Sequence, residues 1–249
     1  MINWNFNPEI FSLFGLSVRY YGLIYAIGFL ITFFYLNYLR KKNKLELSKE
    51  QIYDLIFYAI IGVVLGARIF EVLFWNPSYY FNNLLEIFAV WNGGMSFHGG
   101  LIGGLVAGYI FSKKNKISLL KIADAVTIPV IFGLALGRIG NFLNSELYGT
   151  ITNVSWCVNF QDVQGCRHPY QLYESLKNFI VFFILSFDKK DHKQGYSFLL
   201  GVSLLNIGRF ILDFWKDDLH YLGLTIGQYL SLMFIVIIIY MLLKYYRKS

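Results

Sequence analysis

The chain has 249 residues, of which 56% are hydrophobic and only 15% are charged. This composition excludes an ordinary water-soluble protein and indicates a polytopic membrane protein. A formal net charge of +7 would suit a nucleic-acid-binding protein, but the basic residues are arranged as in a membrane protein, so we expect no nucleic acid partner.

Seven segments are candidates for membrane-spanning helices, each of which needs roughly 20 apolar residues. They are residues 17–39, 52–75, 97–112, 119–138, 170–187, 195–215 and 225–244. The first is too long for a cleavable signal peptide, and its charges follow rather than precede it. The third is short and rich in glycine, so we expect its first part to be broken or re-entrant and to line a cavity. The predicted fold is an all-α integral membrane protein with seven transmembrane helices, forming one domain over residues 1–249.

The basic residues are sorted by side. Most of the 22 Lys and Arg residues follow the first, third or fifth predicted span or end the chain. These are Arg40, Lys41, Lys42, Lys44, Lys49, Lys113, Lys114, Lys116, Lys121, Lys189, Lys190, Lys193, Lys244, Arg247 and Lys248. With seven spans they all share one face, which the positive-inside rule makes cytoplasmic. We therefore predict an outside N-terminus and a cytoplasmic C-terminus.

The remaining basic residues lie within a predicted span or on the outer side. They are Arg19, Arg68, Arg138, Arg167, Lys177, Arg209 and Lys216. Because the orientation rule disfavours these positions, each needs a local reason. Arg209 with Asp213, and Arg68 with Glu71, are spaced to share a helical face, so an internal ion pair is the simplest explanation for both.

Two outer segments are longer than a connection requires. Residues 76–96 contain Trp91-Asn92-Gly93-Gly94, which predicts a turn. Residues 141–169 are predicted to form a small external cap, with a short hairpin near residues 156–160.

The predicted cap holds both cysteines of the chain, Cys157 and Cys166. An oxidising compartment would permit a disulfide, but sequence does not show the geometry that pairing requires, so paired and free thiols both remain open. A zinc site is not expected, because the neighbouring Cys and His residues lack a four-ligand spacing. We expect no metal and no cofactor.

The stretch Gly137-Arg138-Ile139-Gly140-Asn141-Phe142-Leu143-Asn144-Ser145-Glu146 places an arginine, two asparagines and a carboxylate at the end of a long apolar run. An arginine at bilayer depth is costly and usually serves ions, substrates or charge partners, although a snorkelling helix-end arginine is the simpler alternative. Arg138 and Arg209 together would give two cations near the outer leaflet, and planar guanidinium groups suit phosphate oxygens. We therefore predict a phospholipid headgroup site. Asn141 and Asn144 would be neutral donors there, and Glu146 would orient an arginine or accept a proton.

A second motif runs from Trp91 to Gly104 and contains six glycines. His98 stands where the chain enters the bilayer, and we expect the neighbouring glycines to clear space around its ring. A structural and a catalytic histidine both remain open. For Gly103, Gly104 and Gly108 we predict close packing between helices.

These motifs resemble those of the prolipoprotein diacylglyceryl transferase family, and the likeness runs nearly end to end. Arg19-Tyr20-Tyr21-Gly22-Leu23-Ile24-Tyr25 is similar to the family's first-span signature. The runs Arg167-His168-Pro169-Tyr170-Gln171-Leu172-Tyr173-Glu174 and Arg209-Phe210-Ile211-Leu212-Asp213-Phe214 are similar to its fifth-span and sixth-span elements. The chain departs from the family at Leu205, where tyrosine is frequent, and its cap looks shorter than in longer relatives.

The resemblance implies an enzyme of the cell (inner) membrane with its active site toward the outer leaflet. It would move the diacylglyceryl group of phosphatidylglycerol onto the lipobox cysteine of a preprolipoprotein, form a thioether and release glycerol phosphate, the first step of lipoprotein maturation. The candidate catalytic residues are His98, Arg138 and Arg209. The candidate lipid-binding residues are Tyr21, Gly99, Gly100, Asn141, Glu146 and Gly149.

This chemistry agrees with the residue types. A thiol of ordinary pKa about 8.5 must lose its proton before it attacks carbon, and His98 is the candidate base, with arginine-assisted and substrate-assisted deprotonation left open. As the carbon–oxygen bond breaks, the phosphate passes from a monoanionic diester toward a dianionic monoester. Arg138 and Arg209 would therefore favour the transition state over the ground state.

Two other functions compete with this interpretation. An anion or lipid transporter would use the same buried arginines, but no inverted repeat is visible. An intramembrane hydrolase would use Ser145 or Ser96, but neither serine lies in a Gly-x-Ser-x-Gly motif. We therefore favour the transferase.

Overall fold

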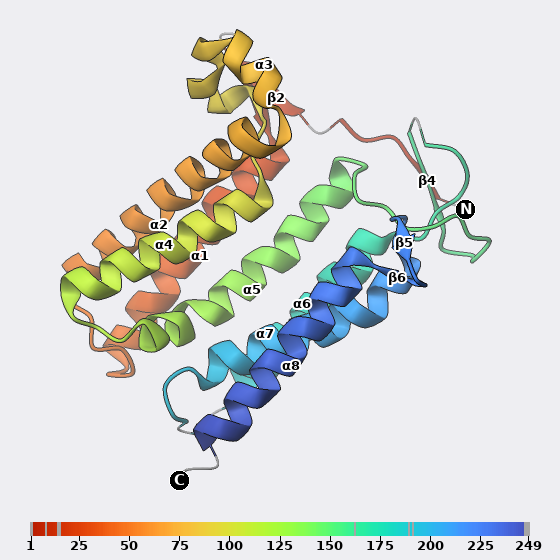
Figure 1. The fold of residues 1–249 in the computed structure, drawn as a ribbon. Coiled ribbons are helices and arrows are strands. Elements are labelled where there is room, and N and C mark those ends of the chain that lie inside the picture. Colours follow the sequence, from red (N-terminus) through yellow and green to blue (C-terminus); the bar gives the residue numbers. More distant parts are fainter. Residues whose placement is uncertain are drawn as a thin grey trace. The chain divides into compact units, whose positions relative to one another are not determined.

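A computed structural model describes residues 2–7, 9–13, 16–161, 163–188, 190 and 192–246 (Figure 1). The chain forms two compact units. The N-terminal unit consists of Phe11–Val18 and Phe29–Val126, and the C-terminal unit of Met1–Ile10, Arg19–Gly28 and Thr127–Ser249.

A long helix occupies each of the seven predicted segments. They are α1 (Tyr20–Lys41), α2 (Lys49–Phe70), α4 (Phe97–Asn115), α5 (Leu119–Leu143), α6 (Tyr170–Phe187), α7 (Tyr196–Leu212) and α8 (Ile226–Tyr246). Within the described residues, five helical segments are long and apolar enough to cross a membrane: Gly22–Lys41, Lys49–Trp75, Leu119–Leu143, Tyr196–Trp215 and Ile226–Lys244. The protein is therefore a mostly helical, multi-pass membrane protein. α4 and α6 are outside this set, since α4 is rich in glycine and α6 carries a polar face.

The expectation of a broken third segment was wrong, because Phe97–Asn115 is one continuous α-helix. Ser96 caps its first turn: the hydroxyl oxygen accepts from Gly99 N at 3.4 Å and from Trp75 Nε1 at 3.1 Å. A capped start satisfies the first backbone donors, so these glycines do not interrupt the helix.

The N-terminal unit is built around the packing of α2 against α4 (Figure 1). The predicted close packing is confirmed at Gly103, where an added Cβ would lie 2.8 Å from the carbonyl carbon of Gly62. Gly66 and Gly99 meet in the same way, since a Cβ on either would lie closer than 3.0 Å to atoms of the facing helix. Small residues thus bring the two backbones together, as is common between membrane helices.

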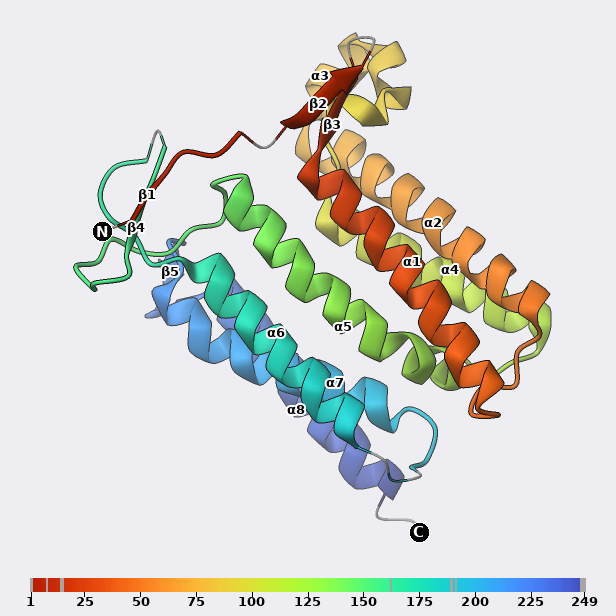
Figure 2. The ribbon, with the colours of Figure 1, turned by 180° about the vertical axis from the view of Figure 1, so that it is seen from behind.

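The end of α2 leads into the predicted outer segment. A π-helical turn η1 (Glu71–Trp75) continues α2 and is followed by three short helices, α3 (Pro77–Asn82), η2 (Leu84–Phe88) and η3 (Val90–Asn92). The predicted turn is confirmed, because Gly93 and Gly94 have φ angles of 88° and 68°. Before α1, the strands β2 (Glu9–Leu13) and β3 (Leu16–Arg19) form a two-stranded sheet (Figure 2).

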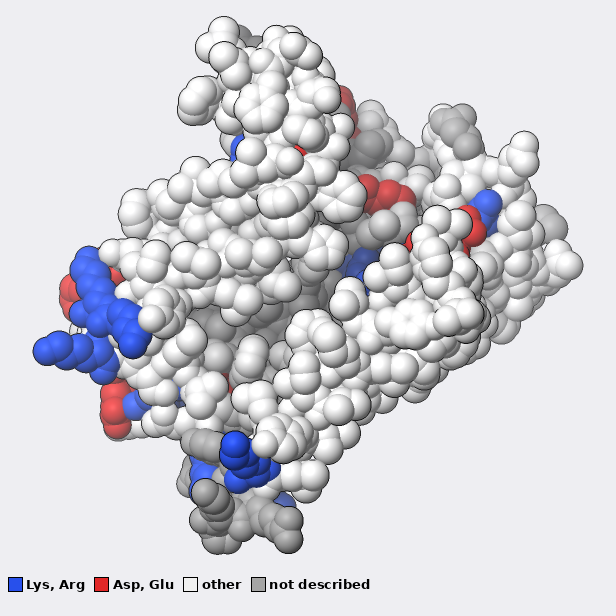
Figure 3. All heavy atoms as spheres, in the orientation of Figure 1, with Lys and Arg blue, Asp and Glu red and all other residues white. Residues whose placement is uncertain are grey.

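Basic side chains gather at one end of the N-terminal unit. In Figure 3 they cover the end where α1 stops, α2 begins and α4 stops, while the sides of these helices show few charges. Of the basic residues used in the orientation argument, Lys189, Arg247 and Lys248 lie outside the described residues.

In the C-terminal unit, α7 packs between α6 and α8 (Figure 2). After α7 a short helix η4 (Asp213–Trp215) leads to the antiparallel strands β5 (His220–Tyr221) and β6 (Leu224–Thr225), which end at α8. Thr225 and Gln228 form a capping box there: Gln228 N donates to Thr225 Oγ1 at 3.1 Å and Thr225 N donates to Gln228 Oε1 at 2.8 Å. Such a box satisfies two backbone donors of the helix start.

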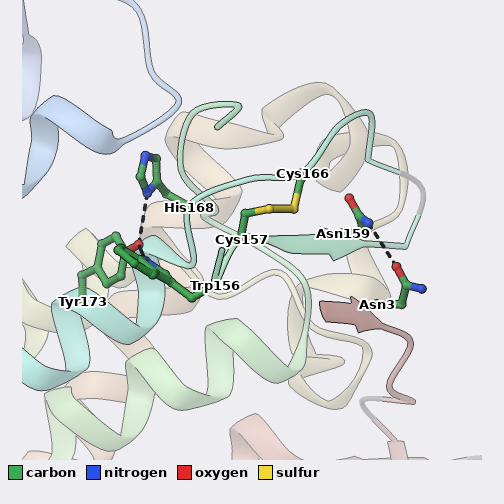
Figure 4. The surroundings of a disulfide bond; sticks show 7 residues. All are labelled: Asn3, Trp156, Cys157, Asn159, Cys166, His168 and Tyr173. Atoms are coloured by element: carbon green, nitrogen blue, oxygen red, sulfur yellow. Dashed lines mark hydrogen bonds between the residues drawn. A yellow bond between two sulfur atoms is a disulfide. The ribbon is translucent and has the colours of Figure 1, made fainter. Parts of the chain in front are cut away.

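The predicted hairpin of the cap was wrong in its pairing. β4 (Val158–Phe160) instead pairs in parallel with β1 (Ile2–Trp4), which lies near the N-terminus, far from β4 in the sequence. Of the hairpin, the described residues of the cap keep two isolated antiparallel bridges, which join Arg167 to Val158 and to Ile151. Cys157 and Cys166 form a disulfide beside the first of these bridges (Figure 4), which answers the question that the sequence left open.

Candidate functional site

The last turn of α5 holds Glu146 against Asn141. Glu146 N donates to Asn141 O and Ser145 N donates to Phe142 O, both at 3.1 Å, with Ser145 in the left-handed region at φ 56°. These are the two bonds of a Schellman helix end, which usually has glycine at the left-handed position. The turned chain lets Glu146 Oε1 accept from Asn141 Nδ2 at 2.7 Å and from Asn144 Nδ2 at 3.4 Å. Glu146 therefore orients the side-chain amides of Asn141 and Asn144. Ser145 is the left-handed residue that ends the helix.

Arg138 lies on α5 and faces α6. Its Nη2 atom is 3.4 Å from Oε2 of Glu174, a carboxylate whose side chain is only 3% exposed. The other oxygen of Glu174, Oε1, accepts from Lys177 Nζ at 2.9 Å. A buried bond from Ser175 Oγ to Ala135 O at 2.9 Å fixes the same helix pair. The carboxylate partner of Arg138 is thus Glu174, whereas Glu146 binds the two amides.

Arg209 lies at the end of α7 and pairs with Asp213. Its Nε atom is 3.5 Å from Asp213 Oδ2, which confirms the predicted ion pair. Asp213 is fully buried and also accepts from the Tyr170 hydroxyl and from Thr225 Oγ1. α6 and the start of α8 therefore fix the carboxylate that holds Arg209.

Both arginines use only some of their hydrogen-bond donors. Among the described residues, Glu174 is the one partner of the Arg138 guanidinium and Asp213 the one partner of the Arg209 guanidinium. Their side chains are 23% and 40% exposed. A guanidinium carries five N–H donors, so each arginine keeps donors for a further acceptor. Both also lie within electrostatic range of Lys177.

Gly149 lies where two segments of the cap meet the end of η4. Gly149 N donates to His168 O at 3.0 Å, and Thr150 N donates to Trp215 O at 2.9 Å. A Cβ on Gly149 would lie 2.5 Å from Trp215 O and 2.7 Å from His168 Cβ. The position thus needs glycine for packing, while its contact with lipid remains a prediction.

The cap positions an aromatic cluster beside the disulfide. The Tyr173 hydroxyl accepts from Trp156 Nε1 at 2.7 Å and lies 3.1 Å from His168 Nδ1 (Figure 4). Partial burial lowers the pKa of His168 below its ordinary value, because the charged imidazolium loses hydration. Arg167 donates to Asp217 Oδ2 at 2.6 Å and to Gly149 O at 3.2 Å, which ties the cap to the chain after α7.

His98 belongs to the N-terminal unit, in the first turn of α4, and is exposed. Its ring contacts that of Phe97 edge-on, with centroids 5.9 Å apart. The expectation that glycines clear space around this ring was wrong for Gly99, which instead packs against Gly66 and Phe70. Gly100 also faces α2, where an added Cβ would lie 3.5 Å from Val63 Cγ1. Lipid contacts of these two glycines remain predictions.

Arg68 is the basic residue that the structure explains most fully. Its side chain donates to Gly93 O at 2.6 Å, to Gly94 O, Ile87 O and Ala89 O at 2.9 to 3.0 Å, to the Tyr80 hydroxyl at 3.1 Å, and to Glu86 O. The predicted ion pair with Glu71 was wrong, since Glu71 accepts from Asn76 Nδ2 instead. Arg68 therefore holds the short helices of the outer segment by their carbonyl groups.

Two predicted positions fall where side chains are not described. Tyr21 lies in the first turn of α1 and Arg19 ends β3, and nothing further is stated of their side chains. Lys216, the remaining basic residue on the outer side, pairs with Asp218 at 2.8 Å.

Glu174, Tyr170 and Gln228 also belong to this region, but no role was predicted for them from the sequence. Glu174 and Tyr170 stand in a recognised motif but had no assigned role, and a carboxylate inside an apolar segment is itself a signal of function. The buried face of α6 shows the pattern clearly, with polar residues at helical spacing: Gln171, Glu174, Ser175 and Asn178. Gln228 is fully buried, and its Nε2 donates to Phe210 O at 3.0 Å.

The comparison with known proteins gives one consistent result. The sequence model described as prolipoprotein diacylglyceryl transferase matches residues 8–244. A protein of Rickettsia rickettsii named phosphatidylglycerol–prolipoprotein diacylglyceryl transferase is 40% identical over 238 residues, which cover 91% of this chain and 92% of the relative. Proteins of the same name from Rickettsia bellii and Geobacter sulfurreducens are 38% and 39% identical, covering 96% and 90% of this chain and 95% and 87% of the relatives. These names support a transferase and give no support to the transporter alternative.

Proposed function

Because the chain belongs to the prolipoprotein diacylglyceryl transferase family, we propose that it transfers the diacylglyceryl group of phosphatidylglycerol to the lipobox cysteine of a preprolipoprotein. The observation that assigns this function to a site is the pair of arginines, Arg138 and Arg209. Each is fixed by one buried carboxylate and keeps guanidinium donors for a phosphate.

The reaction forms a sulfur–carbon bond at the glyceryl carbon and breaks the bond from that carbon to the phosphate oxygen. The thiol loses its proton, and the leaving glycerol phosphate gains a second negative charge. Arg138 and Arg209 stabilise this growing charge without reorganising, since Glu174 and Asp213 already hold them in place.

The remaining site residues support binding and proton transfer. His98 takes the thiol proton. Asn141, oriented by Glu146, donates its amide to the headgroup, while Tyr21, Gly99, Gly100 and Gly149 complete the lipid contacts. No metal or cofactor takes part in this scheme.

In this proposal the chain is a single domain that spans the membrane seven times, with α4 and α6 as the two additional spans. The N-terminus lies outside, the C-terminus lies in the cytoplasm, and residues 141–169 form the external cap. The basic end of the N-terminal unit supports a cytoplasmic position for that end (Figure 3). The active site then lies toward the outer leaflet of the cell (inner) membrane, and nucleic acid is not a partner.

Incubating the purified protein with phosphatidylglycerol and a lipobox peptide tests this function. Mass spectrometry should show a peptide heavier by one diacylglyceryl group, with one glycerol phosphate released per modified peptide. A peptide whose cysteine is replaced by serine is the matched control. An unmodified cysteine peptide with folded protein would reject the proposal.

A further inference from the structure

Lys177 is a buried cation that the proposed mechanism leaves without a role. It lies on α6, and its Nζ atom donates to Glu174 Oε1 at 2.9 Å and to Leu205 O at 3.5 Å. Its stem fills the space beside Gly208 on α7, where an added Cβ would lie 2.6 Å from Lys177 Cγ. Glycine at this position therefore makes room for the lysine.

Lys177 affects how strongly the Glu174 carboxylate interacts with Arg138. The carboxylate is shared, with Oε1 toward Lys177 at 2.9 Å and Oε2 toward Arg138 at 3.4 Å. The shorter contact belongs to the lysine. Without it, both oxygens and the full negative charge of Glu174 would be directed at Arg138, and the arginine would be less available to a substrate anion.

The charges of the cluster can be counted from the ion pairs. Arg138, Lys177 and Arg209 stand against Glu174 and Asp213, which leaves one positive charge. Asp218 also interacts with Arg209, but its charge is balanced by its own ion pair with Lys216. Glu146 is exposed and is held by amides rather than by a cation, so water screens it more strongly. A monoanionic phosphodiester therefore neutralises the cluster, whereas a dianionic phosphate monoester over-neutralises it.

We propose that Lys177 is a positioning residue that acts through Glu174 to keep Arg138 available to phosphate and to hold the cluster at one positive charge. This inference rests on the proposed function of Arg138 and Arg209. The single positive charge attracts the phosphate of phosphatidylglycerol and the growing charge of the leaving glycerol phosphate.

Two neutral substitutions move this charge in opposite directions. Lys177→Met brings the cluster to zero, so the KM for phosphatidylglycerol and the inhibition constant of added glycerol 1-phosphate should each rise about tenfold. Glu174→Gln brings it to two positive charges, so both constants should fall by about the same factor. The double variant restores one positive charge and should return both constants toward those of the unmodified protein.

The controls separate charge from packing. Lys114→Met removes a lysine that contacts Tyr58 in the other unit and should leave both constants unchanged. Lys177→Arg keeps the charge and should retain the constants of the unmodified protein. If Lys177→Met does not fold, Lys177→Gln makes the same test with a neutral donor toward Glu174.

A purely structural ion pair would predict that Lys177→Met and Glu174→Gln weaken anion binding alike. That result, or unchanged constants in a folded Lys177→Met, would overturn the inference while the phosphate site stands. The phosphate site itself fails separately, if Arg138→Ala and Arg209→Ala retain full transfer.

Discussion

The chain uses the arginines of its apolar helices in two different ways. One is seen at Arg68 and the other at Arg138 and Arg209. Arg68 is 5% exposed and donates to six acceptors, five of them backbone carbonyls. Arg138 and Arg209 each have one carboxylate partner among the described residues and are 23% and 40% exposed. A guanidinium whose donors are all used stabilises the structure, whereas one that keeps free donors can bind a substrate.

The two kinds of partner affect the charge and the donors of these arginines differently. Backbone carbonyls leave the charge of Arg68 in place but use up its donors. Carboxylates lower the net charge around Arg138 and Arg209 but leave donors free, and Lys177 returns part of that charge. The number of free donors therefore separates a structural arginine from a functional one better than the sequence position does.

The largest expected effect is on stability, at Arg68. Arg68→Met keeps the apolar stem but leaves the carbonyls of the outer segment without their donor, so we expect a loss of about 3–5 kcal/mol. Thermal unfolding in detergent measures it, with Arg40→Met as the control. A folded Arg68→Met of unchanged stability would show that the carbonyl contacts of Arg68 do not stabilise the structure.

The second largest effect should be on the reaction, at Arg138 and Arg209, whose guanidinium groups keep free donors. Arg138→Ala and Arg209→Ala should each reduce transfer by about 10²–10³-fold while the helical fold persists, because each removes a donor from the growing phosphate charge. Peptide mass spectrometry measures the rate and circular dichroism the fold. Full activity in either variant would exclude that arginine from the phosphate site.

A substitution of His98 tests whether this residue is the base that takes the thiol proton. His98→Gln should lower the transfer rate by about 10²-fold at neutral pH, with little change in the KM for phosphatidylglycerol, because glutamine retains size but accepts no proton. The split between kcat and KM distinguishes a base from a lipid contact. Near-normal turnover would assign proton removal to an arginine or to the substrate.

The smallest effect should come from the cap. Replacing both Cys157 and Cys166 by serine should cost about 2 kcal/mol, because the disulfide closes a short loop. Limited proteolysis of the cap before and after adding a reductant to the unmodified protein reports the same change. Equal protection in all samples would show that β1 and β4 hold the cap without the disulfide.

Local features of the chain were predictable from the sequence, and long-range partners were not. The seven helices follow from apolar runs, and the pairing of Arg209 with Asp213 follows from a four-residue spacing. The pairing of β4 with β1 joins segments that are far apart in the sequence, and no local pattern encodes it. The contact between Arg138 and Glu174 likewise depends on how α5 meets α6, and the partners of Arg68 depend on the turns of three short helices.

A structure of the protein bound to phosphatidylglycerol tests the central claim most directly. The account predicts phosphate oxygens within about 3.2 Å of both the Arg138 and the Arg209 guanidinium groups, with Glu174 and Asp213 still paired to them. A lipid phosphate that contacts neither arginine, while both remain closed on their carboxylates, would contradict it.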